Sequence, residues 1–223
     1  LILYKMEQDT FVFTPEPVDL LTTFRDILAD LSARVRAKKV FVRIVLQGRL
    51  ALPRDSFWVM AEPTLCYSLF SNLVLNAIEA SPASGVVSIF FGQDDQAHVR
   101  IHNSGVVPPN IRSRFFEKYV TSGKAHGTGL GTYSAKIIAT TMGGNILMET
   151  DEESGTTLTV SIASPCSSVF NLEPEAVKQE KTEIPGCMGE AEQQHIDIEM
   201  RTGFERLARE LELNSFESLT RAK

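Results

Sequence analysis

The sequence lacks any long hydrophobic run. Hydrophobic residues make up 43% of its 223 positions, but no apolar stretch approaches the roughly eighteen residues that a membrane-spanning helix requires. We also expect no secretory signal in the given stretch, because Leu1–Leu3 run directly into Lys5 and Glu7. We therefore expect a cytoplasmic chain without direct membrane contact, even if its parent protein is anchored in a membrane.

Cysteine and basic charge are both scarce. The three cysteines, Cys66, Cys166 and Cys187, show neither a CxxC pair nor a Cys/His ligand spacing, so we expect reduced thiols. Cys66 lies in an apolar stretch and is expected to be a small core residue. The formal net charge is −6, whereas a nucleic-acid surface needs a basic stripe. We therefore expect no nucleic-acid partner.

Two asparagines recur at helical spacing within the stretch NLVLNAIEAS, residues 72–81. Asn72, Asn76 and Ala80 would share one stripe of a helix, turned toward a cleft. In such a cleft, Asn76 would offer an oxygen ligand to Mg²⁺, which prefers few protein oxygens together with water and substrate phosphates. Apolar residues on the other parts of the helix would bury it: Leu69, Leu73 and Ile78.

A glycine-rich run, GTGLG, occupies residues 127–131, about fifty residues further on. Its three glycines permit a close approach of the backbone to a ligand, and residues 132–141 are expected to be helical. Backbone amides at the beginning of such a helix bind phosphate. The two stretches together predict a site for a nucleotide and its metal ion.

Three further motifs accompany these two stretches: Asn103-Ser104-Gly105, Phe115–Tyr119 and Gly155-Thr156-Thr157. In this order the sequence resembles the ATP-binding catalytic domain of sensor histidine kinases, within the superfamily that also holds Hsp90-like, gyrase-like and MutL-like ATPases. The stretch at 72–81 resembles the N box, Phe115–Tyr119 the F box, and the other three the glycine boxes. The resemblance covers roughly residues 1–163.

The resemblance implies an α+β fold, a two-layer sandwich whose mixed, mostly antiparallel sheet is covered on one face by helices. It implies ATP and Mg²⁺ as cofactors. We expect the end of a dimerisation helix and a linker in residues 1–17, the catalytic domain in residues 18–164, and a polar linker with a helical tail in residues 165–223.

Periodicity and turn residues predict the individual elements. Asp19 is expected to cap the first domain helix. Helices are expected at residues 20–38, from Pro63 or Thr64 through the N box, at 111–117 and at 132–142. Strands are expected at residues 40–46, 57–60, 86–92, 97–102, 145–149 and 156–163.

Asn103 stands where the family usually has an aspartate that accepts the adenine amino proton. Its carbonyl oxygen can accept the same proton, and Gly105 keeps the family's spacing, although the segment is one residue shorter than usual. A shifted register would place His102 there instead, and a simple turn with a left-handed Asn103 is a third interpretation. The resemblance assigns Thr156 a contact to adenine through water.

The mixed composition of residues 119–126 is typical of a mobile lid over a site. Lys124 is the first candidate for a phosphate contact, with Thr121 and Ser122 as further donors, and solvated loop residues are the open alternative. The resemblance assigns nucleotide contacts to the whole second glycine box: Gly127, Thr128, Gly129, Leu130 and Gly131.

The resemblance implies transfer of the γ-phosphoryl group of Mg-ATP to a histidine, with Asn72, Asn76 and Lys124 as catalytic residues. None of His98, His102, His126 and His195 is followed by Glu in an apolar helical neighbourhood, as the family's acceptor is. We therefore expect the acceptor on a hairpin of the same parent, outside this chain. A homodimeric parent and a response regulator receiver domain are the further expected partners.

The residue at position 72 bears on whether the site would hydrolyse ATP quickly. Gyrase-like and Hsp90-like relatives carry there a glutamate that activates water, whereas Asn72 cannot take a proton. Two alternatives stay open. An anti-sigma-type serine kinase has the same fold, but the junction-like N-terminus argues against it. A degenerate domain that binds nucleotide poorly, or only docks a partner, fits the altered segment at Asn103.

Overall fold

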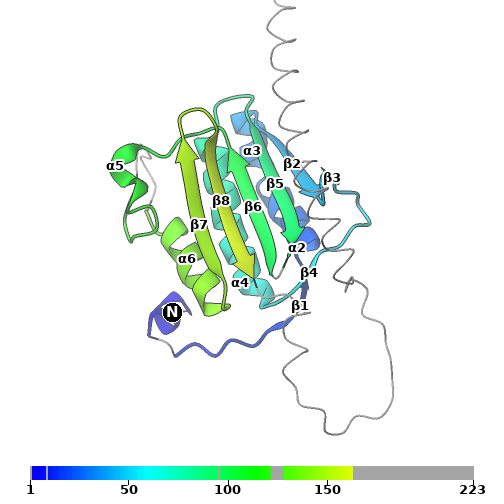
Figure 1. Cartoon of the computed structure of the whole chain (residues 1–223), viewed down its shortest axis with the longest axis vertical. Helices are drawn as coiled ribbons and strands as arrows, with labels where there is room; N and C mark the ends of the chain where they lie inside the picture. Colours follow the sequence, from blue (N-terminus) through cyan, green and yellow to red (C-terminus); the bar gives the residue numbers. More distant parts are fainter. Residues whose placement is uncertain (1, 9, 95, 122–127, 163–223) are drawn as a thin grey trace, which may run out of the picture.

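The computed structural model describes residues 2–8, 10–94, 96–121 and 128–162. Within them, a six-stranded sheet forms one layer and helices form the other (Figure 1). Across the sheet the strands are β3 (Arg49–Leu50), β2 (Phe41–Leu46), β5 (Val86–Gln93), β6 (Ala97–Asn103), β8 (Gly155–Ile162) and β7 (Asn145–Asp151). Only β2 and β5 pair in parallel, and the other neighbours are antiparallel.

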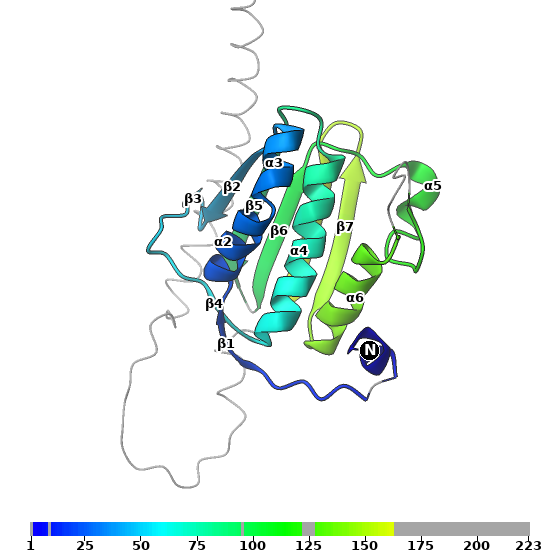
Figure 2. The same ribbon diagram turned by 180° about the vertical axis from the view of Figure 1, so that it is seen from behind.

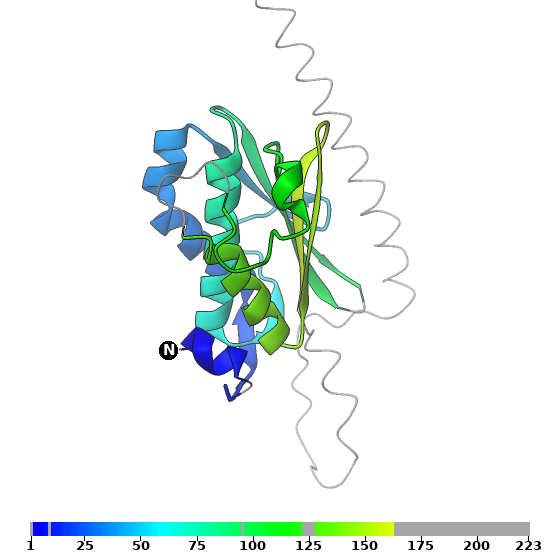
Figure 3. The ribbon, with the colours of Figure 1, turned by 90° about the vertical axis from the view of Figure 1, so that its left-hand side faces the viewer.

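Four of the helices lie over the same face of the sheet, as Figures 2 and 3 show from two sides. They are α2 (Leu20–Asp30), α3 (Ser32–Lys38), α4 (Pro63–Ala80) and α6 (Gly131–Thr141). The predicted α+β sandwich with helices on one face is therefore confirmed. No helix in the described ranges is long and apolar enough to cross a membrane.

The central helix α4 forms because its apolar positions match the helical period. Pro63 occupies its first turn, where the missing N–H costs nothing. Leu69 and Leu73 are fully buried and Ile78 is 1% exposed, as predicted. Cys66 is fully buried among them, and burial raises the pKa of its thiol to about 12, so it is a packing residue.

The chain before the sandwich forms α1 (Ile2–Glu7) and then β1 (Glu16–Asp19), which pairs with β4 (Trp58–Ala61) in a separate two-stranded sheet. Asp19 caps α2 as predicted, since its carboxylate accepts from the Leu21 N–H at 3.2 Å. The same carboxylate accepts from the Phe57 N–H at 2.7 Å and so ties this corner together.

Several local predictions were wrong. The expected helix 20–38 is two helices, because Leu31 has ψ of 1° and ends α2, while the side-chain period continues into α3. The helix expected at 111–117 is α5 (Pro109–Arg112), because Pro109 is suited to a first helical position and turns follow it. Tyr119, the last residue of the stretch that resembles the F box, is 73% exposed, with φ of 63°.

The short strand β3 was not predicted. It follows β2 through Gln47 and Gly48, both with positive φ, and Leu46 pairs with Arg49. Two such residues form the tight turn that suits a hairpin. Gln-Gly is a weak signal, which explains the miss. Residues 165–223, the predicted linker and tail, lie outside the described residues.

Candidate functional site

The predicted metal and phosphate motifs meet where α4 passes the beginning of α6. A Cβ atom placed on Gly131 would lie 3.5 Å from Oδ1 of Asn72 and 3.8 Å from Nδ2 of Asn76. Both asparagines are half-buried, between the buried side of α4 and the solvent. Two stretches about fifty residues apart in sequence are thus side by side, with carboxamides against the first residue of α6.

The first turn of α6 faces the same space. Gly131 is its first residue and Leu130 precedes it as N-cap. The N–H groups of a first helical turn have no partner within the helix, and the helix dipole is positive there. Negative phosphate oxygen is the ligand that this combination favours.

The segment before Gly131 is closed at its base by a backbone hydrogen bond. The Tyr119 N–H donates to the Gly129 carbonyl at 3.0 Å, and Gly129 has φ of +66°. A Cβ atom at Gly129 would lie 2.5 Å from the Tyr119 carbonyl carbon, so only glycine fits. The predicted lid thus begins and ends at one point on the protein.

The lid itself is only partly described. Thr121 and Thr128 are exposed, and the Thr128 hydroxyl accepts from the Leu130 N–H at 3.4 Å. Ser122, Lys124 and Gly127, three of the predicted nucleotide contacts, lie outside the described residues. Their predicted roles stay predictions.

Asn103 ends β6 at the other end of the candidate site. It is 4% exposed and pairs with Val87 on one side and Thr156 on the other. It belongs to a strand and is not among the residues with positive φ, so the interpretation as a left-handed turn was wrong. Its side chain donates from Nδ2 to the Gly105 carbonyl at 3.3 Å.

Gly105 packs directly on the C-terminal end of α4. A Cβ atom there would lie 2.2 Å from the carbonyl oxygen of Ala80, which no side chain permits. Ala80 is on the Asn72–Asn76 stripe of α4, so Gly105 lies at the Ala80 end of the stripe and Gly131 beside Asn72 and Asn76. The structure therefore brings residues of three predicted motifs together along one side of α4: the N box, the first glycine box and the second glycine box.

Thr156 is 5% exposed and shares the Gly105 carbonyl, to which its hydroxyl donates at 2.7 Å. Its oxygen also lies 2.9 Å from the Thr150 hydroxyl, which in turn accepts from the Val107 N–H at 3.1 Å. Thr150 was not among the predicted residues. It reaches this position only through the β7–β8 register, where it lies opposite Thr156.

His102, the alternative to Asn103, points to the other face of the sheet, as the alternation of burial along β6 shows. Its Nδ1 lies 3.1 Å from the Thr157 hydroxyl. Burial, with a smaller contribution from the positive charge of Arg43, lowers the pKa of its imidazole. Asn103 and not His102 therefore lies beside Gly105.

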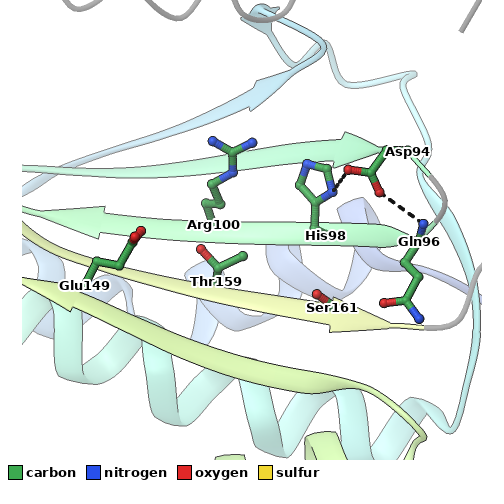
Figure 4. A pocket seen from close by; sticks show the side chains of 7 residues that line it. All are labelled: Asp94, Gln96, His98, Arg100, Glu149, Thr159 and Ser161. Atoms are coloured by element: carbon green, nitrogen blue, oxygen red, sulfur yellow. Dashed lines mark hydrogen bonds and ion pairs between the residues drawn. The ribbon is translucent and has the colours of Figure 1, made fainter. Parts of the chain in front are cut away.

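A polar groove on that outer face of the sheet contains none of the predicted site residues. Figure 4 shows its lining, in which Asp94 lies between His98, at 3.6 Å, and the Gln96 N–H, at 3.1 Å. The groove is lined by Asp94, Gln96, His98, Arg100, Glu149, Thr159 and Ser161. It is separated by the sheet from the helices that carry the candidate site.

A second network that the sequence did not reveal ties α1 to the base of the lid. The carboxylate of Glu7 receives the ammonium of Lys118 at 2.9 Å and the hydroxyl of Tyr133 at 2.9 Å. The ammonium also lies 4.9 Å from the centre of the Tyr133 ring. The hydrogen bonds from Lys118 and, to a lesser extent, Tyr133 lower the pKa of Glu7.

A metal ion at this site would take most of its ligands from the bound nucleotide, because the protein offers few. The described residues contain no group of three or more His, Cys, Asp or Glu side chains placed to hold a metal. Nδ2 is the Asn76 atom next to the Gly131 position, and the same carboxamide carries Oδ1, a hard oxygen of the kind that Mg²⁺ accepts, near a phosphate-favouring helix terminus. This donor set fits Mg²⁺ carried by a nucleotide.

The fold and the site define a class of ATP-binding protein. Residues 61–165 match the model of the family described as histidine kinase-, DNA gyrase B-, and HSP90-like ATPase, and form an ATP-binding domain of that family. Within it, the chain is 28% identical over 189 residues to the aerobic respiration control sensor protein ArcB of Escherichia coli K12. That match covers 81% of this chain and 23% of ArcB.

Solved structures agree with this class. The catalytic domain of histidine kinase ThkA is 25% identical with a TM-score of 0.57, over 69% of this chain and 97% of that one. The Acinetobacter baumannii histidine kinase AdeS has the same fold, with a TM-score of 0.60 at 18% identity over 74% of each chain. The domain is therefore an ATP-binding catalytic domain of the sensor histidine kinase type.

Proposed function

We propose that this chain binds Mg-ATP and donates the γ-phosphoryl group to a histidine of a phosphoacceptor domain in its parent protein. The observation that supports this most is the proximity of Asn72 and Asn76 on α4 to Gly131 at the beginning of α6. An oxygen donor for a cation would then lie beside backbone amides for phosphate. The chain spans 23% of the length of ArcB, so what the whole parent protein does is proposed here from this one domain.

Asn76 would hold Mg²⁺ through its carboxamide oxygen. When bound, that cation would supply neutralisation of the phosphate charge. The backbone amides of Gly131 and the next residues of α6 orient the phosphates. At the other end, Asn103 accepts from the amino group of the base. Catalysis then consists mainly of holding donor and acceptor in line, which suits an imidazole that is its own nucleophile.

Asn72 fits transfer better than hydrolysis. It lies one turn before Asn76 beside Gly131, where a carboxylate could activate water, but a carboxamide cannot accept a proton at working pH. The phosphoryl group is thus retained until a histidine arrives. The expected partners follow from this chemistry: a phosphoacceptor hairpin, and a receiver domain that takes the phosphoryl group afterwards.

Titration calorimetry with ATP, with and without Mg²⁺, tests the proposal. Intact chain should bind ATP more tightly with Mg²⁺, and Asn76→Ala should weaken that binding roughly 10- to 100-fold, because hydrogen bonds and contacts to charged groups contribute about 1.5–3 kcal/mol. Asn145→Ala removes an exposed carboxamide on β7 and is the matched control. No binding by the intact chain, or an unchanged Mg²⁺ response of folded Asn76→Ala, would refute the assignment.

A further inference from the structure

We infer that the outer face of the sheet, on the half formed by β3, β2 and β5, is a docking surface for residues 198–213 of this chain's own C-terminal part. The surface is called the apolar strip below. It consists of the apolar side chains that point away from the helices on these three strands: Phe41, Val45, Leu50, Val86 and Phe90. The inference concerns the face opposite to the proposed nucleotide site and does not depend on nucleotide binding.

The pairing register assigns the apolar strip to the outer face. Phe91 of β5 faces the helices, because its ring centre lies 5.1 Å from that of Phe24 on α2. Side chains alternate along a strand, so Phe90 points to the outer face. Directly paired residues share a face, and Phe90 pairs with Val45 of β2, which pairs with Leu50 of β3. The remaining two members follow by the same two rules.

The two halves of the outer face differ in composition. On β6 and β8 the outward side chains are polar, and they line the groove of Figure 4. This alternation is typical of a sheet with one solvated face. In contrast, β2 and β5 read FVRIVL and VVSIFF, which are the hydrophobic runs of strands covered on both faces. A cover over the apolar strip is therefore expected.

The described helices do not provide that cover. The helices α2, α3, α4 and α6 all lie on the opposite face of the sheet (Figure 3). On the apolar strip, Phe41 is 67% exposed, Leu50 63% and Val86 36%, whereas Val45 between them is 3% exposed. A group of large exposed apolar side chains on neighbouring strands marks an interaction surface.

The chain itself contains a segment that needs such a surface. The last described strand, β8, ends at Ile162, and residues 163–223 follow it. The pattern of residues 198–213 predicts an amphipathic helix, whose apolar positions recur at helical spacing: Phe204, Leu207, Ala208 and Leu211. A helix of this length is marginal in water unless its apolar side is covered.

The connection is long enough to bring this segment to the apolar strip. Only β6 and β5 lie between β8 and β2, so the distance across the sheet is roughly 14 Å at the usual strand spacing. A flexible linker of the length of residues 163–197 spans roughly 30 Å on average. A segment tethered in this way has an effective concentration on the order of 1 mM, which favours it over a second copy in dilute solution.

The charge within the apolar strip also fits this segment. Arg43 lies between Phe41 and Val45 on β2 and donates from Nε to the Ser88 hydroxyl at 2.8 Å. Burial lowers the pKa of its guanidinium, and no carboxylate of the described ranges forms an ion pair with it. A partly desolvated cation favours a partner that brings carboxylates. In residues 198–213 the apolar stripe is bordered on its two sides by Glu210 and Glu212.

Cross-linking within the full chain tests the inference. Val86→Cys on the apolar strip is combined with Ala208→Cys, and a short bismaleimide joins the two thiols. The natural Cys166 and Cys187 are replaced by serine. Cys66 is fully buried, with a raised pKa, so it does not compete.

Leu147→Cys takes the place of Val86→Cys in the control. Leu147 is 58% exposed and lies on the outer face of β7, next to the strand from which the C-terminal part starts. Random motion would therefore favour the control position. We expect docking to make the link to Val86→Cys roughly ten-fold faster than the link to Leu147→Cys.

Two further variants examine the segment itself. Phe204→Glu combined with Leu211→Glu should abolish the preference for Val86→Cys, because a carboxylate cannot be buried against the apolar strip without a large cost. Glu205→Gln, outside the apolar stripe, should leave the preference unchanged. If Val86→Cys fails to fold, Phe41→Cys replaces it at a position that is 67% exposed.

Each outcome supports or overturns the inference. Equal linking rates at the two positions, or a preference that survives Phe204→Glu with Leu211→Glu, overturn the docking of residues 198–213. Links between two chains in place of links within one chain identify a second copy as the occupant and also overturn it. The proposed nucleotide site stands in each of these cases, because it lies on the other side of the sheet.

Discussion

The two ends of the candidate site are built in opposite ways. The strand end, comprising Asn103, Gly105, Thr150 and Thr156, consists of side chains at the ends of β6, β7 and β8, hydrogen-bonded to each other and to one short loop. The helix end, comprising Asn72, Asn76, Gly129 and Gly131, consists of half-buried side chains and the base of a loop.

The burial of the two ends differs accordingly. Asn103 and Thr156 are 4% and 5% exposed, whereas Asn72 and Asn76 are only half-buried. Buried polar networks are rigid and costly to disturb, while exposed polar contacts contribute little. Under the proposed function, we therefore expect the strand end to hold the base rigidly and the helix end to adjust during phosphoryl transfer.

The largest effect on the rate of ATP hydrolysis is expected from adding a general base to the helix end, which has none at position 72. Asn72→Glu places a carboxylate one turn before Asn76, and a positioned base contributes about 10²- to 10⁴-fold to rates. The rate of ATP hydrolysis, measured as phosphate release, should rise by up to that factor if the carboxylate reaches a water in line with the γ-phosphate. Asn145→Glu adds the same charge to exposed β7 and should not change the rate.

A substitution in the hydroxyl network of the strand end should lower the free energy of unfolding. Thr150→Val keeps the shape but removes the acceptor of the Val107 N–H and the donor to Thr156, which should cost about 1–3 kcal/mol of unfolding free energy. Denaturant unfolding measures it. Thr159→Val, on the outer face of the same sheet, is the control. Equal costs for the two variants would mean that the hydroxyl chain does not hold the loop.

The smallest effect is expected from the contact between α1 and the base of the lid. The hydrogen bonds from Lys118 and Tyr133 lower the pKa of Glu7. A carboxyl whose folded-state pKa is lowered stabilises the protein above its unfolded pKa, and this stabilisation is lost as the pH falls through the folded value. The melting temperature of Glu7→Gln should therefore lie slightly below that of the intact chain at pH 7, and the two should converge in acid.

Glu153→Gln, in the turn after β7, removes an exposed carboxylate that is not part of this network and serves as the control for Glu7→Gln. Convergence of Glu7→Gln with the intact chain at high pH, instead of low pH, would contradict the assigned direction of the pKa shift.

The sequence predicted features that depend on local period and spacing. The buried side of α4, the cap at Asp19 and the strands of the β5–β6 hairpin all follow from a few neighbouring residues. The break at Leu31 depends on one backbone angle, which leaves the hydrophobic period unchanged. Local patterns therefore identified elements better than their boundaries.

Contacts between remote residues were beyond the same reasoning. Thr150 matters only because the register of β7 and β8 puts it opposite Thr156, and threonines on edge strands are common. Glu7 and Lys118 are 111 positions apart and carry no motif. The spacing of Asn103 and Gly105 was visible in the sequence. The orientation of the Gly105 carbonyl, to which the Asn103 side chain donates, was not visible in the sequence.

We propose above all that the chain holds ATP for transfer to a histidine on another domain. The direct test is to incubate it with γ-labelled ATP and Mg²⁺, alone and with a separate phosphoacceptor hairpin from the same parent. We predict acid-labile label on the hairpin, none on residues 1–223, and little free phosphate in either case. Label on a histidine of this chain, or rapid phosphate release with an unlabelled hairpin, would contradict the account.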